Sequence, residues 1–526
     1  SLSRSQGSGS NTVWTFSSWI YKCKSKNQVF CNFGSSPEGQ LGWGANDKLY
    51  IYNGSTTVAI TTQVFRDIGW YHIHLAYNTG ESGANKVKLS VNGSQISAFD
   101  TDNRSSAGAF NNANQNGQTL RLGNNGSDSG TICLEGYMAE TVILDGTASA
   151  VSNFGEYDST GTFWTPLSSA TIKGLTFGTN GFYLDNTTNA QTDASGEGNN
   201  FTNNGSIATS THTPTNINCL LNPLWKNNSA VLSNGNRTKD EGATGWQFVM
   251  ATLGVSSGKW YWEVKAESLS DGEAMMTGIA NDTINAQGTN STGTGFYGYS
   301  SYGVTYSTSS ASYGDTYGDD DIIGVQLNMD DGEIHFYKNN TIQNSGTAAF
   351  TGLTGVYYPM TAVYNLYHPV HRFAEDEWSY SAPTGYKALT TTNIASAITR
   401  TKSNLEEYFS TTLYEGNNEI QRVGKFLPFT NSSFTVANSA LFNAANEEYF
   451  SRTFETPTDQ DVWSLSWWMK TGNVEAALGP RGIMGGATHN KDLIYVTTTA
   501  IYIAFNGVID YQIDVDDPSS FHHYYL

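Results

Sequence analysis

Segments in which apolar or aromatic residues alternate with polar ones recur along this chain, and turn residues separate them. Early in the chain the pattern is clearest in "VWTFSSWIYK" (13–22), "KLYIYNG" (48–54) and "WYHIHLAYN" (70–78). Because successive side chains of a β-strand point to opposite faces, this period of two predicts half-buried strands and not helices. Many such strands with turns between them predict an all-β fold, with antiparallel sheets packed as tandem sandwiches or jelly rolls.

The composition agrees with an all-β chain. Aromatic residues make up 13% of the 526 residues, and charged residues make up only 14%. Helical proteins carry more Lys, Glu and Arg on their surfaces, and disordered chains contain few aromatic residues. At about 150 residues per domain, the length predicts roughly three domains.

The net charge of −20 bears on the partners of the chain. No cluster of Lys and Arg occurs that would neutralise phosphates, so we expect no nucleic-acid partner. No apolar run approaches the length of about 18 residues that marks a spanning helix, so we expect no membrane insertion. We expect no signal peptide either.

The chain contains an internal duplication. Three pairs of segments match in the same order and at similar spacing: "SRSQGSGSNTVWTFSSWIYK" (3–22) with "SRTFETPTDQDVWSLSWWMK" (451–470), "KLYIY" (48–52) with "DLIYV" (492–496), and "GWYHIHL" (69–75) with "SFHHYYL" (520–526). The second copy stops at Leu526, where the first copy continues with further strands. Because half a sandwich would leave open sheet edges, we expect residues 1–526 to be an internal window of a longer polypeptide.

The alternating pattern divides the chain into five parts. Stretches rich in Gly, Asn and Thr, which favour irregular structure, separate three regions of alternation. We predict a first jelly roll (1–149), an irregular connector (150–222), a second sandwich (223–395), a shorter connector (396–431) and a second jelly roll that is incomplete (432–526).

Six segments of the second sandwich carry a family resemblance: "GKWYWEVKAES" (258–268), "TGIAND" (277–282), "GYSSYGVTYS" (298–307), "GDDDIIGVQLNMDDGEIHFYKNN" (318–340), "YYPMTAVYN" (357–365) and "APTGYKALT" (382–390). In this order they resemble a SPRY domain. The resemblance implies a sandwich of antiparallel sheets that serves as a protein- or glycan-recognition scaffold without catalysis. In that scaffold the period of two places Trp260 and Trp262 in the core and Tyr261 and Glu263 on the outer face.

The regions around this sandwich carry two further resemblances. "VWTFSSWIYK", the "VNG" hairpin (91–93) and "GYMAETVILDG" (136–146) make the flanking repeats similar to laminin-G/concanavalin-A-like jelly rolls. In the connector, "GTNGFYLD", "DASGEGNNFT" and "TPTNINCLLNPL" lead into the SPRY-like unit. That arrangement resembles large virion proteins of tailed bacteriophages, which are described as tail-fibre or other structural proteins. This last step is an analogy, because a fold does not fix a function.

A segment rich in Tyr, Ser and Gly (293–318) has the composition of an adaptable recognition surface. We predict that its less strand-like part faces a ligand, with Tyr306, Tyr313 and Tyr317 as the candidate binding residues. The alternative interpretation is that these strand and loop residues fill the sandwich.

The acidic turn "GDDDIIG" (318–324) offers candidate ligands for a metal ion. Asp319, Asp320 and Asp321 carry carboxylate oxygens of the kind that Ca²⁺ prefers, and laminin-G-like folds often carry this ion. The alternative is an ordinary solvated hairpin turn, and we expect no other cofactor.

The four cysteines include no CxxC pair, so we expect no zinc site. Two arrangements are open for Cys23 and Cys31. They either face each other across a short hairpin or remain buried free thiols.

Patterns that carry catalysis are missing from the sequence. No G-x-S-x-G elbow, HExxH motif or phosphate loop occurs. Glycoside hydrolases need two neighbouring carboxylates, but Glu135 and Glu140 are five residues apart, which predicts opposite faces of a strand. His522 and His523 are adjacent and also point to opposite faces. We therefore predict that the chain is not an enzyme.

Together these features predict a structural protein of a tailed-phage virion, either a tail fibre or a fibre or decoration of the capsid surface. Its β-sandwiches would recognise a host-surface glycan or receptor. Its other partners would be virion proteins and copies of itself, and a trimer would suit a fibre. The second interpretation is a secreted or cell-surface adhesion protein of a cell. The third is a concanavalin-A-like glycoside hydrolase.

Overall fold

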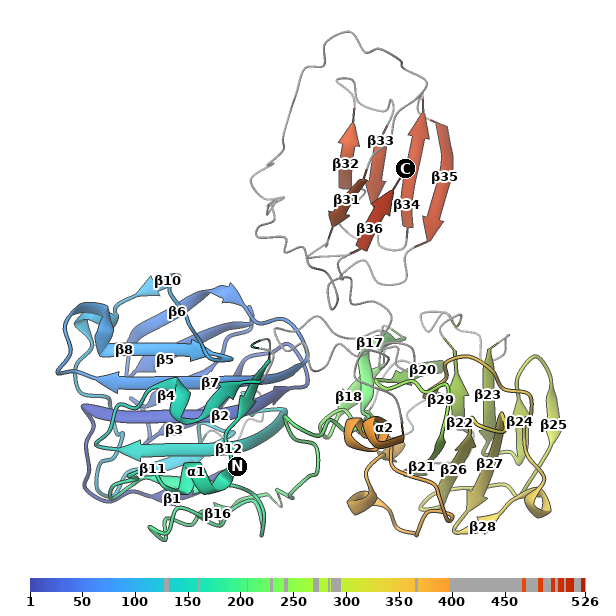
Figure 1. The fold of residues 1–526 in the computed structure, drawn as a ribbon, viewed down its shortest axis with the longest axis horizontal. Helices are drawn as coiled ribbons and strands as arrows, with labels where there is room; N and C mark the ends of the chain where they lie inside the picture. Colours follow the sequence, from blue (N-terminus) through green and yellow to red (C-terminus); the bar gives the residue numbers. More distant parts are fainter. Residues whose placement is uncertain are drawn as a thin grey trace. The chain divides into compact units, whose positions relative to one another are not determined.

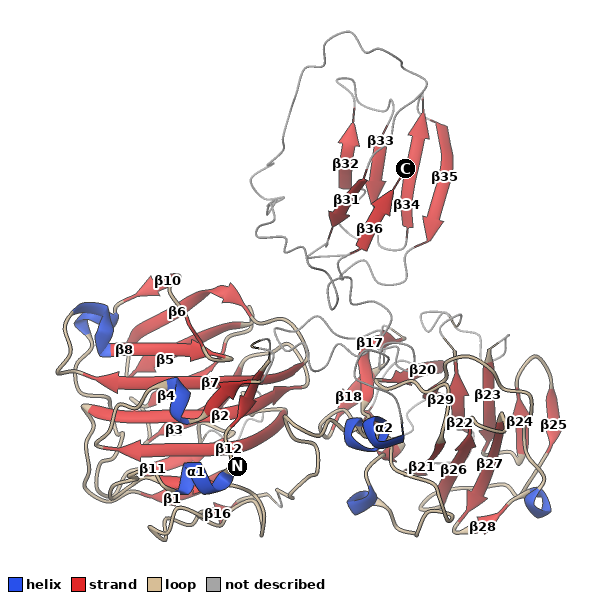
Figure 2. Ribbon diagram, in the orientation of Figure 1, coloured by secondary structure: helices blue, strands red, loops and turns tan. Residues whose placement is uncertain are grey.

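Most of the regular structure in the described residues is β-strand, and the few helices are short (Figures 1 and 2). The computed structural model describes residues 1–397, with gaps at 127–131, 159–160, 162, 206, 228–229, 241–244, 268–273, 282–283, 285–294 and 365–367, and six strands between Ser466 and Tyr525. The all-β class predicted from the sequence is confirmed. Among these residues no helix has the length and apolar character needed to cross a membrane. The chain divides into two units, Ser1–Leu427 and Pro428–Leu526.

The first sandwich consists of two antiparallel sheets with the core between them. The eight-stranded sheet has the order β10 (Phe99–Asp102), β6 (Thr56–Val64), β5 (Lys48–Asn53), β4 (Gly39–Trp43), β3 (Gln28–Phe33), β11 (Thr119–Leu122), β1 (Leu2–Ser5) and β16 (Thr202–Asn203). The six-stranded sheet has the order β15 (Phe182–Leu184), β12 (Gly136–Asp145), β2 (Val13–Lys22), β7 (Gly69–Asn78), β8 (Val87–Val91) and β9 (Ser94–Gln95). In the core, Trp14 of β2 packs against Phe33 of β3 and Tyr77 of β7. The helices η1 (Gly83–Lys86) and η2 (Arg104–Ser106) lie in loops.

The first sandwich extends beyond residue 149, where its end was predicted. β15 pairs with β12 and β16 pairs with β1, so residues of the expected connector complete both sheets. Residues around η3 (Val151–Asn153) and α1 (Ser169–Lys173) cover the outer face of β12, and the hairpin of β13 (Gly155–Tyr157) and β14 (Trp164–Pro166) places Trp164 over His72 of β7. Phe154, which follows η3, and Ile172 of α1 are buried in one cluster with Val142 of β12. This cover explains why strands of the six-stranded sheet are buried on both faces.

The second sandwich consists of two seven-stranded antiparallel sheets. The first, called here the β17–β25 sheet, has the order β17 (Leu221–Lys226), β20 (Trp246–Ala251), β29 (Tyr358–Tyr364), β22 (Ala274–Ala280), β23 (Phe296–Ser300), β24 (Val304–Tyr306) and β25 (Ser310–Ser312). The second, called the β18–β28 sheet, has the order β18 (Val231–Ser233), β19 (Thr238–Asp240), β30 (Val370–Arg372), β21 (Lys259–Lys265), β26 (Ile322–Asn328), β27 (Glu333–Lys338) and β28 (Thr341–Ile342). Trp260 and Trp262 of β21 are buried in the core, as the period of two predicts. The 3₁₀ helix η4 (Asn344–Gly346) lies between β28 and β29.

A segment without strand pattern, residues 373–390, covers the outer face of β21, and we call it the strap. It contains the helix η5 (Glu375–Glu377). Trp378 packs edge-on against Tyr261 at 5.0 Å between ring centroids. Further along, Lys387 exchanges backbone hydrogen bonds with Lys259 and Tyr261. Tyr261 therefore points to the outer face as predicted, but the strap buries it.

The chain enters and leaves the second sandwich at neighbouring positions. The Cys219 N–H donates to the Leu389 carbonyl at 2.8 Å, and the Thr391 N–H donates to the Ile217 carbonyl at 2.9 Å. An antiparallel bridge between Asn218 and Thr390 lies between these bonds. Helix α2 (Thr391–Ala397) begins where the chain leaves.

The second unit repeats a strand register of the first. β31 (Ser466–Met469) pairs with β36 (His522–Tyr525), and Trp468 lies opposite His523. In the first sandwich Trp19 lies opposite His72, which are the positions that the duplication aligns with them. β32 (Arg481–Gly485), β33 (Leu493–Val496), β34 (Ala500–Phe505) and β35 (Val508–Asp514) form a four-stranded sheet. The connector predicted at 396–431 lies almost wholly outside the described residues.

Candidate functional site

The three tyrosines predicted to bind a ligand do not lie on one surface. Tyr313 and Tyr317 belong to the core of the second sandwich, with 8% and 5% of their surface exposed. The Tyr317 hydroxyl donates to the carbonyls of Met275 and Tyr299, at 3.1 and 3.0 Å. The prediction that Tyr313 and Tyr317 face a ligand is therefore wrong, because their rings fill the core. Tyr306 is partly exposed and packs on a different apolar cluster.

The three aspartates proposed as calcium ligands lie in an exposed turn before β26. Asp320 forms an ion pair with Lys265 at 2.8 Å, and Asp321 forms one with Lys338 at 3.2 Å. Asp319 is exposed at the same turn. Across the described parts of the chain, no three His, Cys, Asp or Glu side chains gather closely enough to hold a metal ion. The lysines neutralise two of the carboxylates that a calcium ion would need.

The outer face of the β17–β25 sheet carries an apolar cluster of its own. Met275 and Val363 point into the core, so their neighbours Met276 and Ala362 point to the opposite face. The buried members of this outer cluster are Phe248, Met250, Met276, Ala280, Phe296, Tyr358, Met360 and Ala362.

Four aromatic residues surround this outer cluster, and we call Trp225, Trp246, Tyr306 and Tyr364 the aromatic rim. The first three are partly buried against the cluster, and Tyr364 is 37% exposed. Trp246 lies opposite Tyr364 across β20 and β29, with ring centroids 5.6 Å apart. Leu224, next to the rim on β17, is 55% exposed. Partly exposed Trp and Tyr side chains offer a large apolar contact together with a polar N–H or O–H, which suits recognition of a partner.

A Ser–His contact in the first sandwich has the distance of a catalytic pair, but the histidine nitrogen that faces the serine carries a proton. Ser17 Oγ lies 2.8 Å from His72 Nε2, and the indole N–H of Trp164 donates to His72 Nδ1 at 2.9 Å. Because an indole nitrogen only donates, Nδ1 is unprotonated, so the proton of the neutral ring is on Nε2 and points at Ser17. Burial also lowers the pKa of His72 well below its ordinary value. His72 therefore does not act as a base toward Ser17.

The two carboxylates weighed as a hydrolase pair have separate partners. Glu135 pairs with Lys24 at 2.7 Å, and Glu140 accepts a hydrogen bond from the Tyr183 hydroxyl. A glycosidase needs its two carboxyl groups free on either side of one bond. This arrangement gives no such pair.

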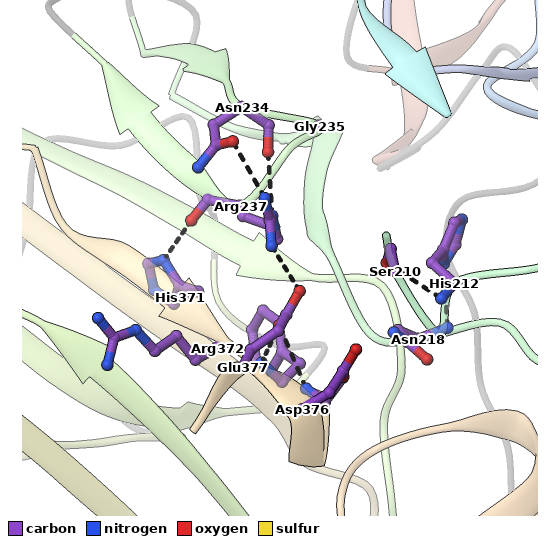
Figure 3. A network of polar contacts seen from close by, with 12 residues as sticks. Ser210, His212, Asn218, Asn234, Gly235, Arg237, His371, Arg372, Asp376 and Glu377 are labelled. Carbon is purple, nitrogen blue, oxygen red and sulfur yellow. Dashed lines mark hydrogen bonds and ion pairs between the residues drawn. The ribbon is translucent and has the colours of Figure 1, made fainter. Parts of the chain in front are cut away.

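A polar network lies where the connector, the β18–β19 hairpin and the strap meet, and Figure 3 shows its residues. Arg237 forms an ion pair with Glu377 of η5 at 2.6 Å and donates to the Asn234 carbonyl and side chain, at 3.2 and 3.1 Å. The Arg237 carbonyl accepts the Nδ1–H of His371 at 3.1 Å. Thr211 of the connector donates to Asp376, the neighbour of Glu377, at 3.1 Å. The network fastens the connector and the hairpin to the strap.

His212 of the connector anchors the same region among aromatic rings. Its ring stacks on Trp70 at 5.5 Å and lies edge-on to Tyr21 at 4.4 Å. The Asn218 N–H donates to His212 Nδ1, so the ring proton is on Nε2. Burial lowers the pKa of His212 to about 3, so the ring stays neutral.

The β18–β19 hairpin also contacts the first sandwich directly. The Tyr137 hydroxyl donates to the Gly235 carbonyl at 2.9 Å, and the Asn236 amide donates to the Cys23 carbonyl at 3.1 Å. Gly235 has a positive φ of 67°, and a Cβ there would lie 2.5 Å from the Tyr137 hydroxyl oxygen. We call residues 210–218 together with 234–237 the joint.

Cys23 and Cys31 are buried free thiols and not a pair across a hairpin, which were the two arrangements open from the sequence. Cys23 and Cys31 are both free and buried, and they belong to different apolar clusters. Burial raises the pKa of both thiols, so each stays protonated and serves as a small apolar side chain.

Comparison with known proteins supports the central sandwich as a recognition module. Residues 259–368 match the model of the SPRY domain family. One similar solved structure is the crystal structure of the SPRY domain of human HERC1, at 20% identity and a TM-score of 0.27, covering 31% of this chain and 99% of that one. No curated protein matches the chain. The match to the family model shows that the chain contains a SPRY domain, a β-sandwich module of protein interaction or recognition, whereas the laminin-G-like and virion assignments stay predictions.

Sequence reasoning missed the joint, and it assigned residues 382–390 of the strap to the SPRY-like sandwich without predicting that the strap covers β21. Arg237 and His212 hold the joint, and Glu263 of β21 accepts the backbone N–H groups of Ser379 and Tyr380 in the strap. All three are single polar side chains without a repeated pattern. One signal was present, because "NGN" (234–236) marks a tight turn. A charged residue inside the aromatic strand "WYWEV" also indicates a buried partner.

Proposed function

We propose that this chain is a non-enzymatic structural protein of a tailed-phage virion, and that the aromatic rim of its SPRY domain binds a host-surface glycan or receptor. The presence of the SPRY domain carries the recognition part of the proposal, because modules of this kind serve recognition. The rim is a place on that domain where several large aromatic side chains reach the surface.

The rest of the chain supports a display role. The joint attaches the SPRY domain, which carries the rim, to the first sandwich through hydrogen bonds and ring contacts. The duplicated sandwich and the phage-like connector fit a modular fibre. In a homo-oligomer such as a trimer, several rims would bind together and multiply weak contacts.

Rim substitutions in the intact chain test the binding surface. Wild type, Trp246→Ala and Tyr364→Ala are applied to an array of bacterial surface polysaccharides and, by flow cytometry, to a panel of bacterial cells. We expect each variant to lose tenfold or more in affinity for the targets that wild type binds, since buried aromatic contacts dominate binding energy at about 2 kcal/mol or more.

Tyr157→Ala is the matched control, because Tyr157 is an exposed tyrosine of the first sandwich, outside the rim. It should bind as wild type does. Equal binding by the rim variants and wild type, with all proteins folded by circular dichroism, would place the recognition surface elsewhere.

The virion role needs its own test. Peptides of this chain should appear in purified phage particles, and the gene should lie beside tail or capsid genes. Peptides found instead in the envelope of a cell, with no such neighbours, would favour the adhesion protein and refute the virion assignment.

A further inference from the structure

Lys22 is a fully buried lysine at the end of β2 with a carboxylate at contact distance. Its Nζ lies 2.5 Å from Asp47 Oδ1 and 2.5 Å from the Phe65 carbonyl oxygen. The two side chains have 0% and 6% of their surface exposed. The pair is therefore enclosed by protein, whereas the lysines of four other ion pairs keep part of their surface in water: Lys24, Lys48, Lys173 and Lys265.

One aromatic ring and one hydroxyl lie beside this pair, and the charges of Asp67 and Arg66 act on Lys22 from nearby. The Trp43 ring lies 5.5 Å from Lys22 Nζ. Ser25 Oγ donates toward both carboxylate oxygens of Asp47, at 2.6 and 2.5 Å. Burial lowers the pKa of Lys22, while the hydrogen bond with Asp47 acts in the opposite direction.

Two buried charges are costly to hold in such a place. Removing a carboxylate and an ammonium from water costs several kcal/mol for each ion, and the attraction between them offsets this only in part. Moving one proton from Nζ to the carboxylate leaves an amine and a carboxylic acid, both neutral and already in contact. An amide is the neutral product that these two groups form.

We propose that Lys22 and Asp47 join in an intramolecular amide bond after the sandwich has folded. In this step the Nζ lone pair attacks Cγ of the protonated Asp47, and a C–N bond forms while the carbonyl electrons move to the other oxygen. The Ser25 hydroxyl stabilises that oxygen. The C–OH bond then breaks, and the hydroxyl leaves as water with a proton from Nζ.

The reaction needs no oxidant, metal or cofactor, because amine and acid give amide and water. The enclosed pair supplies the proximity that would make such a step feasible without an enzyme. The Phe65 carbonyl accepts an N–H of Lys22 and holds the amine beside Asp47.

The bond would connect the two sheets of the first sandwich. β2 belongs to the six-stranded sheet, and Asp47 lies in the turn before β5 of the eight-stranded sheet. A covalent link at this point would prevent the sheets from separating at that end of the core.

Intact-mass spectrometry of the purified wild-type chain tests the proposal. We expect a mass one water below that of the sequence, and a branched peptide that contains both Lys22 and Asp47 after proteolysis. A mass equal to that of the sequence, with the two residues in separate linear peptides, would overturn the proposal and leave an ordinary ion pair.

Two variants identify the atoms involved. Asp47→Asn should form the same amide by loss of ammonia in place of water. Lys22→Arg keeps a positive charge but lacks the amine, so its mass should equal that of its sequence. Lys48→Arg is the matched control, because Lys48 pairs with Asp100 at the surface, and it should still show the loss of water. Loss of water from Lys22→Arg as well would place the modification elsewhere and refute the assignment.

Discussion

Glu263 of β21 attaches the strap to the SPRY domain through a carboxylate that is fully buried. Its Oε2 accepts the Ser379 N–H at 2.7 Å, and its Oε1 accepts the Tyr380 N–H at 2.9 Å. The Tyr261 hydroxyl donates to Oε1 at 3.2 Å, and Arg372 Nη1 lies 3.6 Å from Oε2. We predict that Glu263→Gln releases the strap without unfolding the core.

The magnitude follows from these contacts. Glutamine keeps the shape of glutamate but replaces one acceptor oxygen with an NH₂ group, which faces a backbone N–H of the strap. A buried donor without a partner costs about 1–3 kcal/mol, and Arg372 loses a charged neighbour in addition. We therefore expect the free energy of unfolding to fall by about 2–4 kcal/mol.

Hydrogen exchange together with urea unfolding measures both effects. In Glu263→Gln the Ser379 and Tyr380 amides should exchange faster, while amides of β26 keep their protection. Glu333→Gln is the control, because Glu333 lies on β27 with a partly exposed side chain. If the strap amides of Glu263→Gln exchange as in wild type, or if the unfolding free energy is unchanged, the attachment inferred here is refuted.

Three further predictions concern the core, the buried histidines and the joint. Trp262→Ala should cost about 3–5 kcal/mol and unfold the SPRY domain, as calorimetry would show; a folded variant that merely lost a ligand would contradict the core placement. Burial lowers the pKa of His74 from 6.5 to about 4, so below pH 6.5 the unfolded chain binds a proton that the folded chain does not. Stability should then fall as the pH drops from about 6.5 to 4, by about 3 kcal/mol for this residue; urea midpoints that stay level across this window would argue against a buried neutral ring. Gly235→Ala should place a Cβ against the Tyr137 hydroxyl and loosen the joint, which limited proteolysis of residues 203–222 would report. Gly385→Ala is the control for backbone strain, because Gly385 also has a positive φ but a Cβ there would contact no other atom. Equal cleavage of the two variants would contradict the prediction.

The sequence predicted the parts of the fold that depend on local period. Trp260 and Trp262 point into the core because residues two apart on a strand share a face. The alternation along the strand is enough to predict this. The duplication aligns Trp468 with Trp19 and His523 with His72, and the structure pairs both couples across neighbouring strands. The placement of Trp260 and Trp262 needs no knowledge of distant contacts.

The features that the sequence did not predict depend on pairing between distant residues. β15 and β16 are two or three residues long and join the first sandwich only because β12 and β1 offer free edges. Tyr313 and Tyr317 have the composition of a binding loop, but the turn that follows β25 brings both rings into the core. Burial of Glu263 depends on the strap, which arrives more than a hundred residues later and has no periodic pattern.

The hydrogen-bonded positions where the chain enters and leaves the SPRY domain have a mechanical consequence. Residues 217–219 and 389–391 run antiparallel, and the chain continues outward from the same end of this short ladder. A tensile force along the chain would therefore open the ladder one bond at a time, as a zipper opens, before it sheared the sheets. The ladder would yield before the sandwich behind it and lengthen the chain under load, while that sandwich, with its aromatic rim, stayed intact.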